Sequence, residues 1–151
     1  MSIFHAFNIS ASGLTSQRLR MDVAASNIAN AQTTRARIDE NGEFEPYRRK
    51  MVAMQPNGQT FKHFLHKAQA GRKRPTEGVK ATHILHDREP FKLVYEPSHP
   101  DADEDGYVRY PNVDPLKEMV DVMSATRSYE ANVTALNATK DMLLKALEIG
   151  K

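Results

Sequence analysis

The sequence predicts an α+β fold in which long N- and C-terminal helices pair as a coiled-coil-like bundle, with a small β-rich insert between them. Both ends of the chain carry a heptad-like apolar spacing, and the middle is rich in Pro, Gly, aromatic and β-branched residues. We therefore expect an N-terminal helix with a polar collar at residues 1–34, the insert at 35–113 and a C-terminal helix at 114–151.

The first helix is predicted from apolar residues that recur in alternating steps of three and four. Only Arg18 interrupts this series. Such spacing is that of a coiled-coil seam, and its small residues favour close helix approach. The seam positions are Phe4, Phe7, Ala11, Leu14, Met21, Ala25 and Ile28.

The last helix carries the same spacing, and its start is well marked. Asp114 suits the N-cap, Pro115 the first helical position and Gly150 the C-terminal cap. Thr126 and Lys140 are the exceptions in the seam. The seam positions are Met119, Val122, Tyr129, Val133, Leu136, Leu143 and Leu147.

The lengths of the two helices predict how they are used. At about 1.5 Å per residue they would span roughly 40 and 50 Å, whereas a compact globule of this chain length has a radius of gyration of about 15 Å. The small insert is too short to bury both seams. We expect the seams to pack against each other, against other copies, or both.

The insert is expected to contain short strands at residues 47–54, 79–85, 91–95 and 107–110, and a mobile basic loop at 63–76. The net charge of the whole chain does not indicate a nucleic-acid partner, because its 21 basic and 19 acidic residues nearly balance. The basic run at 72–74 keeps nucleic-acid binding as an alternative, although interleaved aromatic residues are missing from it.

The composition also limits metal, secretion and membrane functions. The chain has no Cys, which excludes disulfides and thiolate metal sites. Its first residues do not show the basic, apolar and cleavage-site pattern of a secretory signal, and no apolar run reaches about 18 residues. We therefore expect neither ordinary secretion nor membrane insertion. Export by a dedicated machine that leaves its signal uncleaved is compatible with this pattern.

An acidic stretch, DADEDGYV, matches the start of a calcium-binding loop. Asp101, Asp103, Asp105 and Gly106 occupy the positions of the first ligands and of the turn glycine. The twelfth position is Asn112 rather than Glu, and prolines interrupt both flanking helices. We therefore interpret the stretch as an acidic turn between two strands, and keep a calcium-regulated binding module as the alternative.

Catalytic motifs are missing from the sequence. It contains no GxSxG, GxGxxG or P-loop pattern. The His pairs 63/66 and 83/86 lack a third ligand nearby, and in a strand His83 and His86 would point to opposite faces. We expect neither an enzyme nor a cofactor or metal site.

Several segments resemble one known family. SASGLTSQRLRMDVAASNIANAQTT is similar to the N-terminal signature of bacterial flagellar axial proteins, the rod and hook family, and PYRRK, YEPSHPDADEDGYVRYPNVD and the last helix resemble its rod members. The stretch HFLHKAQAGRKRPTEG departs from the pattern, and Asp114-Pro115 stands where the family pattern has Asn. The residues that carry the resemblance are Asn27, Ile28, Ala29, Asn30, Pro46, Tyr47, Arg48, Arg49, His99, Pro100, Asp101, Asp103, Gly106, Tyr107, Arg127, Tyr129 and Asn132.

The resemblance implies a non-enzymatic structural subunit of the proximal rod of the flagellar basal body, a drive shaft that transmits torque. It implies export through the flagellar type III apparatus without a cleaved signal. The implied partners are copies of the chain, other rod proteins, the inner-membrane ring and the export apparatus, without nucleic acid or direct membrane insertion.

In that family the terminal helices pair and pack against neighbouring copies, which would use the apolar seams. The collar at 27–34 would turn the chain outward while it satisfies exposed backbone groups. Arg18, Arg20, Arg127 and Glu130 are candidates for setting the register between helices or subunits.

Overall fold

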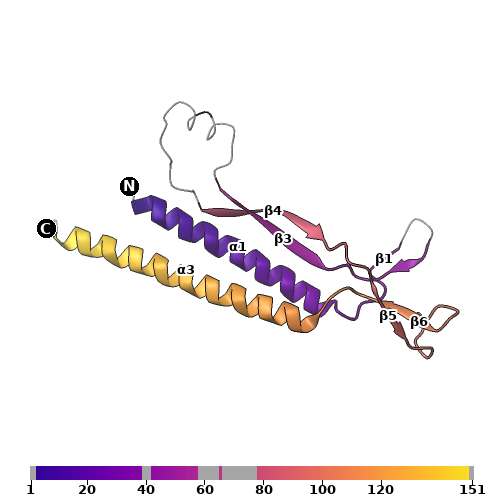
Figure 1. Ribbon diagram of the computed structural model, residues 1–151. Helices are drawn as coiled ribbons and strands as arrows, with labels where there is room; N and C mark the ends of the chain where they lie inside the picture. The colour runs from indigo at the N-terminus through magenta and orange to yellow at the C-terminus, as the bar shows by residue number, and fades with distance from the viewer. Residues whose placement is uncertain (1–2, 39–41, 58–64, 66–77, 150–151) are drawn as a thin grey trace. The chain divides into compact units, whose positions relative to one another are not determined.

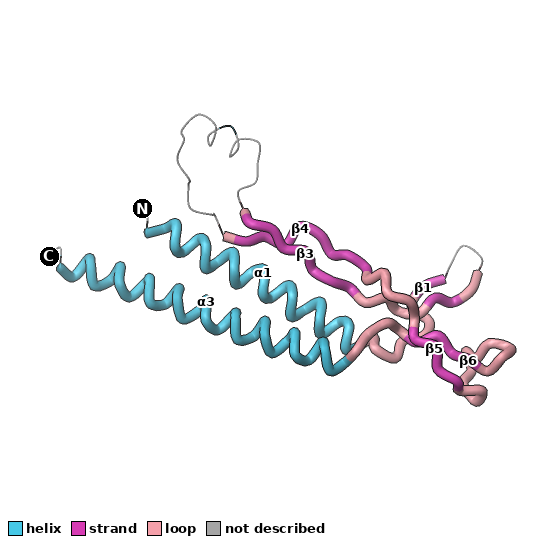
Figure 2. Tube along the Cα trace, viewed as in Figure 1, coloured by secondary structure: helices cyan, strands magenta, loops and turns pink. Residues whose placement is uncertain are grey.

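The computed structural model describes residues 3–38, 42–57, 65 and 78–149, and it confirms the α+β class. Helices at the two ends of the chain bracket short paired strands (Figures 1 and 2). The predicted loop at 63–76 lies outside the described residues, apart from Leu65. The elements are α1 (Ile3–Ala29), β1 (Arg37–Ile38), β2 (Phe44–Glu45), β3 (Lys50–Pro56), β4 (Val79–His86), β5 (Lys92–Tyr95), β6 (Tyr107–Tyr110) and α3 (Pro115–Ile149).

All four predicted strands are present, as β3, β4, β5 and β6, and they pair as β3 with β4 and β5 with β6. Strand β3 begins at Lys50 rather than at residue 47. The backbone N–H of Tyr47 donates instead to Thr33 O, and that of Arg49 to the Asn112 side chain. The pair β1–β2 was not predicted, because two residues per strand are too few to show a periodicity.

The chain turns after α1 through its polar collar. The Asn30 side chain donates to Ser26 O at 2.9 Å, and the Thr33 hydroxyl donates to Asn30 Oδ1 at 3.3 Å. The backbone N–H groups of Ala31 and Thr33 donate to Ile28 O and Asn30 O. The two backbone bonds satisfy carbonyl groups that the end of a helix leaves free, and the two side-chain bonds tie Asn30 to Ser26 and Thr33.

The start of α3 agrees with the prediction. Pro115 is its first residue, and Asp114 Oδ1 accepts a hydrogen bond from the Leu116 N–H at 3.1 Å. The Asp114 carbonyl accepts the Glu118 N–H at 3.0 Å. Asp114 therefore acts as the N-cap, and proline removes an N–H that would otherwise lack a partner.

The chain groups into two compact units. Unit 1 consists of residues 1–19, 53–83 and 124–151, and unit 2 of residues 20–52 and 84–123. Each unit thus contains part of α1 and part of α3. In the described residues of the whole chain, neither helix is long and apolar enough to cross a membrane.

In unit 1, α1 approaches α3 closely at Gly13. A Cβ atom added there would lie 3.0 Å from the Oδ1 atom of Asn132, so the absence of a side chain permits this contact. On its other side α1 is bonded to the start of β4. Ser12 Oγ accepts the Val79 N–H at 3.1 Å, and Ser16 Oγ donates to Val79 O at 3.3 Å. Ser16 and Ala125 are buried in this unit.

In unit 2, apolar residues from α1, strand β6 and the loops form a small core. It consists of Ala24, Tyr47, Val108, Pro111 and Val113. The β5–β6 hairpin lies in this unit, with Lys92 opposite Tyr110 and Tyr95 opposite Tyr107. Val108 is fully buried, whereas the neighbouring positions Tyr107 and Arg109 are exposed, as the period of two in a strand predicts.

The turn of this hairpin contains the acidic stretch noted in the sequence. Gly106 has φ +78°, and its N–H donates to Asp103 O at 2.8 Å. A Cβ atom at Gly106 would lie 3.0 Å from the Tyr95 ring, which in turn contacts Tyr107 edge-on with ring centroids 5.3 Å apart. Glycine is thus required here both by the left-handed backbone and by the close tyrosine ring.

Candidate functional site

Unit 2 contains a cluster of buried polar side chains, which we call the buried polar junction. It joins the end of α1, the start of β3, the segment after β4 and the first turns of α3. Polar groups of this kind are costly to bury unless they are paired. The members of the junction are Asn27, Tyr47, Arg49, Asp87, Asn112 and Glu118.

Asn27 uses its full hydrogen-bonding capacity. Its Nδ2 atom donates to Lys50 O and to Glu118 Oε2, both at 2.9 Å. Its Oδ1 atom accepts the Lys50 N–H and the Tyr47 hydroxyl, both at 3.0 Å. An amide has two donors and two acceptor positions, so the side chain is completely satisfied and its orientation is fixed. Asn27 therefore pairs with both backbone groups of the first residue of β3.

Glu118 is the largest fully buried side chain in the described chain, at 2% exposure. Its Oε2 atom accepts from Asn27, and its Oε1 atom accepts from Arg49 Nε at 2.7 Å. Both oxygens are thus used by donors from parts of the chain far away in sequence. Helix position alone would place this glutamate on a solvated first turn, so sequence reasoning missed it.

Arg49 connects Glu118 to the segment after β4. Its Nη1 atom lies 3.1 Å from Asp87 Oδ2, and the Asp87 N–H donates to Arg49 O at 2.8 Å. Burial on its own would lower the pKa of Arg49, but hydrogen bonds to Glu118 and Asp87 raise it above its ordinary value. The guanidinium therefore stays charged between two carboxylates.

The pKa of Asp87 is held below its ordinary value. The main cause is a hydrogen bond from the Glu89 backbone N–H, and the side chain of Arg49 adds to it. Asn112 closes the junction, because its Oδ1 atom accepts the Arg49 N–H at 2.8 Å and its Nδ2 donates to Glu89 O at 3.1 Å. The ionised forms of Arg49 and Asp87 are thus the ones that the structure stabilises.

Arg20, one of the four predicted register residues, contacts the other helix. It donates to Asp121 of α3 at 2.6 Å, and both side chains are about one-third exposed. Together with the Asn27–Glu118 bond, this contact shows that α1 and α3 run antiparallel in unit 2. Arg18, Arg127 and Glu130 are exposed.

A second polar cluster fixes the loop before β6. Asp101 accepts hydrogen bonds from Thr34 Oγ1 at 2.7 Å and from Arg35 Nε at 2.6 Å, and these lower its pKa. The Asp101 N–H donates to His99 Nδ1 at 3.1 Å. The carboxylate that would be the first calcium ligand is therefore already engaged by a guanidinium. Within the described residues, no group of three or more His, Asp or Glu side chains could hold a metal ion.

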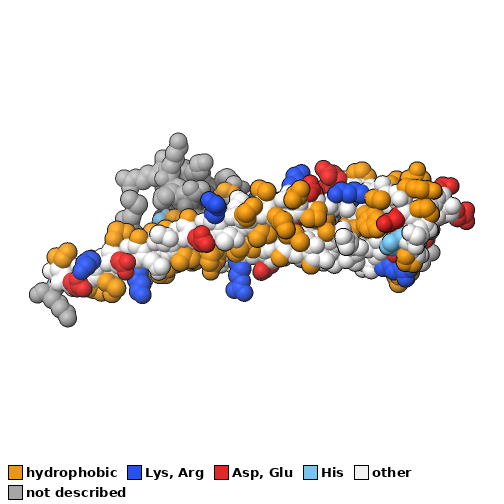
Figure 3. Space-filling model, turned by 90° about the horizontal axis from the view of Figure 1, so that it is seen from below, with side chains coloured by type: hydrophobic (Ala, Val, Ile, Leu, Met, Phe, Trp, Pro, Cys, Tyr) orange, Lys and Arg blue, Asp and Glu red, His pale blue; other side chains and the backbone are white. Residues whose placement is uncertain are grey.

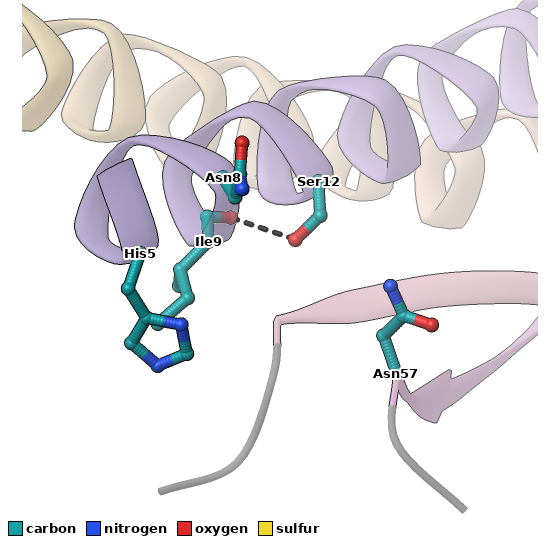
Figure 4. Close-up of a pocket in the computed structure, with 5 residues that line it drawn as sticks. All are labelled: His5, Asn8, Ile9, Ser12 and Asn57. Carbon is teal, nitrogen blue, oxygen red and sulfur yellow. Dashed lines mark hydrogen bonds between the residues drawn. The ribbon is translucent and has the colours of Figure 1, made fainter. Parts of the chain in front are cut away.

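A shallow polar pocket lies in unit 1 beside the start of α1 (Figure 4). Asn57, which follows β3, directs its amide toward the helix, and the Ser12 hydroxyl donates to Ile9 O at 2.7 Å. Among the described residues, His5 Nε2 finds no hydrogen-bond partner. The described residues that line it combine a few polar side chains with one apolar side chain and show no catalytic arrangement.

Most of the predicted seam residues are only half-buried within one chain. Figure 3 shows hydrophobic side chains at many points of the surface, mixed with charged ones. Three of the predicted seam residues, Ala25, Met119 and Leu147, are exposed. Among the described side chains of α1, the buried positions lie outside the predicted seam: Ser10, Gly13, Ser16, Ala24 and Asn27. The half-buried seam residues are Phe7, Leu14, Met21, Ile28, Val122, Tyr129, Val133, Leu136 and Leu143.

The residues that carried the family resemblance are distributed over several of these sites. Asn27, Tyr47 and Arg49 meet in the buried polar junction, where Asp87, Asn112 and Glu118 are members that the sequence did not reveal. Pro46 precedes them and is buried. Another group, Asn30, His99, Asp101 and Gly106, shapes the collar and the β5–β6 turn.

The remaining resemblance residues do not form one site, although Asp103 and Tyr107 lie in the β5–β6 hairpin described above. Arg48 pairs with Glu45 at 3.2 Å and lies over the Phe91 ring. Asn132 faces Gly13 in unit 1. Ala29, Pro100, Asp103, Tyr107 and Arg127 are exposed, and Ile28 and Tyr129 are half-buried.

Comparison with known proteins gives consistent matches over the whole chain. Residues 7–37 match the family described as "Flagella basal body rod protein", and residues 104–149 match "Flagellar basal body rod FlgEFG protein C-terminal". A Bacillus subtilis protein named "Flagellar basal-body rod protein FlgC" is 59% identical over all 151 residues of both chains. Proteins of the same name are 43% identical in Escherichia coli O157:H7 and 37% identical in Aquifex aeolicus, over at least 99% of each chain.

Proposed function

The chain belongs to the FlgC family of flagellar basal-body rod proteins, and from this premise we propose how it serves the rod. It is a structural protein of the basal-body rod, not an enzyme. We propose that it polymerises with copies of itself and with other axial proteins into the proximal part of a shaft that transmits torque. The observation that carries this is the identity to relatives of that name along the full length of both chains.

The surface of α3 supports assembly with neighbours. Leu116, Met119, Val120 and Met123 recur at helical spacing on α3 and are all more than half exposed. Apolar side chains in such a row are commonly covered by a partner. The half-buried seam residues of α1 and α3 would then become fully buried only in the assembled rod. Their role as subunit contacts is part of this proposal.

The proposal extends to location and delivery. The rod would cross the periplasm, contact the inner-membrane ring at its base and receive this subunit through the type III export apparatus, with its signal uncleaved. These steps are what the resemblance to flagellar rod proteins implies, and the relatives' names support the basal-body rod as the location. The calcium alternative has no structural support, because Asp101 is engaged by Arg35 and Thr34.

A complementation experiment tests the proposal. In a strain that lacks its own copy of the gene, the wild-type chain should restore swimming and should appear in purified basal bodies. Asn27→Leu and Asn30→Leu should lower both, because each removes hydrogen bonds that fix the end of α1. Glu104→Gln, in the exposed acidic turn, is the matched control and should behave as wild type. Full swimming without incorporation into basal bodies would contradict a rod function.

A further inference from the structure

The buried polar junction links segments that are far apart along the chain, and Glu118 is its central acceptor. Asn27 and Glu118 are separated by 91 residues, and Arg49 and Glu118 by 69. Neither oxygen of the Glu118 carboxylate is free, because one accepts from the end of α1 and the other from the residue just before β3. The first turns of α3 therefore supply the acceptor that both other segments require.

We propose that Glu118 acts as a latch, so that the pairing of Asn27 with the Lys50 backbone forms only when the first turns of α3 are docked. In this arrangement the end of α1, the start of β3 and the start of α3 become ordered together. The apolar core of unit 2 would drive compaction, whereas the latch would determine whether the polar segments reach their final conformation.

The chemistry of the carboxylate carries this inference. The Asn27 Nδ2 group has two acceptors, Lys50 O and Glu118 Oε2, and loses one of them without Glu118. Without Glu118, the Arg49 guanidinium also loses its shortest contact with an anion, which is to Glu118 Oε1 at 2.7 Å. The Arg49 side chain is only 16% exposed, so water can replace this contact only in part. Asp87 at 3.1 Å and Asp121 at 3.8 Å are the anions that remain near it. A buried cation that loses a partner is strongly destabilised.

Glutamine is a sharp probe of the latch because it preserves the shape of glutamate. It has one acceptor and one donor group at its end, whereas Asn27 Nδ2 and Arg49 Nε are both donors. Whichever way the amide is turned, one of the two donors faces an NH₂ group. Glu118→Gln therefore breaks one of the two bonds while it leaves the apolar packing of α3 intact.

Amide hydrogen exchange in the full-length chain reads the latch directly. The Lys50 N–H reports the pairing with Asn27, and the Asp87 N–H reports the Arg49 segment. The Glu96 N–H, which donates to Gly106 O in the β5–β6 hairpin, reports the rest of unit 2. Glu118→Gln should accelerate exchange at Lys50 and Asp87 by about 10- to 100-fold, as expected for losing a buried hydrogen bond. Exchange at Glu96 should change less than about threefold.

Two further variants keep the test decisive. Asp141→Asn, at an exposed position of α3, is the matched control and should leave all three amides unchanged. Arg49→Lys keeps the charge but cannot reproduce the planar geometry of the guanidinium, so it should give the Glu118→Gln pattern in weaker form. The latch is refuted if Lys50 exchange stays at the wild-type rate in both junction variants. It is also refuted if Lys50, Asp87 and Glu96 accelerate equally in both, because Glu118 would then act on global stability alone.

Discussion

Replacing Asn27 by leucine should destabilise the protein strongly, because that single side chain satisfies several buried groups. Leucine has a similar size but makes no hydrogen bonds. The change leaves the N–H and C=O of Lys50, the Tyr47 hydroxyl and one oxygen of Glu118 without their present partner. Each buried group that loses its partner costs about 1–3 kcal/mol. Relaxation and entry of water would recover part of this, so we expect a loss of about 3–5 kcal/mol in the free energy of unfolding.

Urea denaturation followed by circular dichroism at 222 nm measures this loss. Asn30→Leu is the matched control. Asn30 is also an asparagine at the end of α1, but its side chain only donates to Ser26 O and accepts the Thr33 hydroxyl, and it is partly exposed. It should cost about 1 kcal/mol or less, as for a helix cap. A loss below about 1 kcal/mol for Asn27→Leu, or equal losses for the two variants, would contradict the reasoning, because buried unpaired groups should dominate the difference.

Three further predictions concern other parts of the chain. Gly13→Val should lower the free energy of unfolding by about 1–3 kcal/mol in the same urea assay, because the added side chain overpacks against Asn132. Gly13→Ala adds less bulk and improves helix propensity, so its free energy of unfolding should stay within about 1 kcal/mol of wild type. Asp114→Ala removes the N-cap of α3 and should cost about 1 kcal/mol, and an unchanged urea midpoint would contradict that role. The pKa of Asp87 is lowered, mainly by the Glu89 N–H. The contribution of Asp87 to stability is therefore complete above its ordinary pKa of 3.8, and it is lost as the pH falls through the lower pKa of the folded state. Acid titration of Asp87→Asn should therefore show a smaller loss of stability between about pH 5 and pH 2 than wild type, and identical slopes would refute the assignment.

The parts of the fold that could be predicted are those with a repeated or local signal. The helix spacing located α1 and α3, and the Asp114-Pro115 pair marked the start of α3 to the residue. The longer strands were found from their β-branched and aromatic residues. The start of β3 was placed too early, because the backbone donors of Tyr47 and Arg49 bind partners that lie far away in sequence.

The buried polar junction could be predicted only in part. Asn27, Tyr47 and Arg49 were singled out by resemblance, but without their partners. Glu118 and Asp87 carry no local signal, since a glutamate in the first turns of a helix and an aspartate after a strand are ordinary solvated residues in most proteins. Their role depends on long-range contacts that periodicity does not record. The seam residues remain a prediction, because the contacts proposed for them are with other copies of the chain and the structure describes a single copy.

The way Asn27 pairs with position 50 has a consequence for sequence change. The asparagine contacts only the backbone N–H and C=O of Lys50, groups that nineteen of the twenty amino acids share. Position 50 is therefore free to vary in side chain without disturbing this pairing, and only proline, which lacks the N–H, would remove one of its bonds. Position 27 has no such freedom. The contact therefore constrains the side chain at position 27 but not the side chain at position 50. Amino-acid changes at the two positions should be independent of each other.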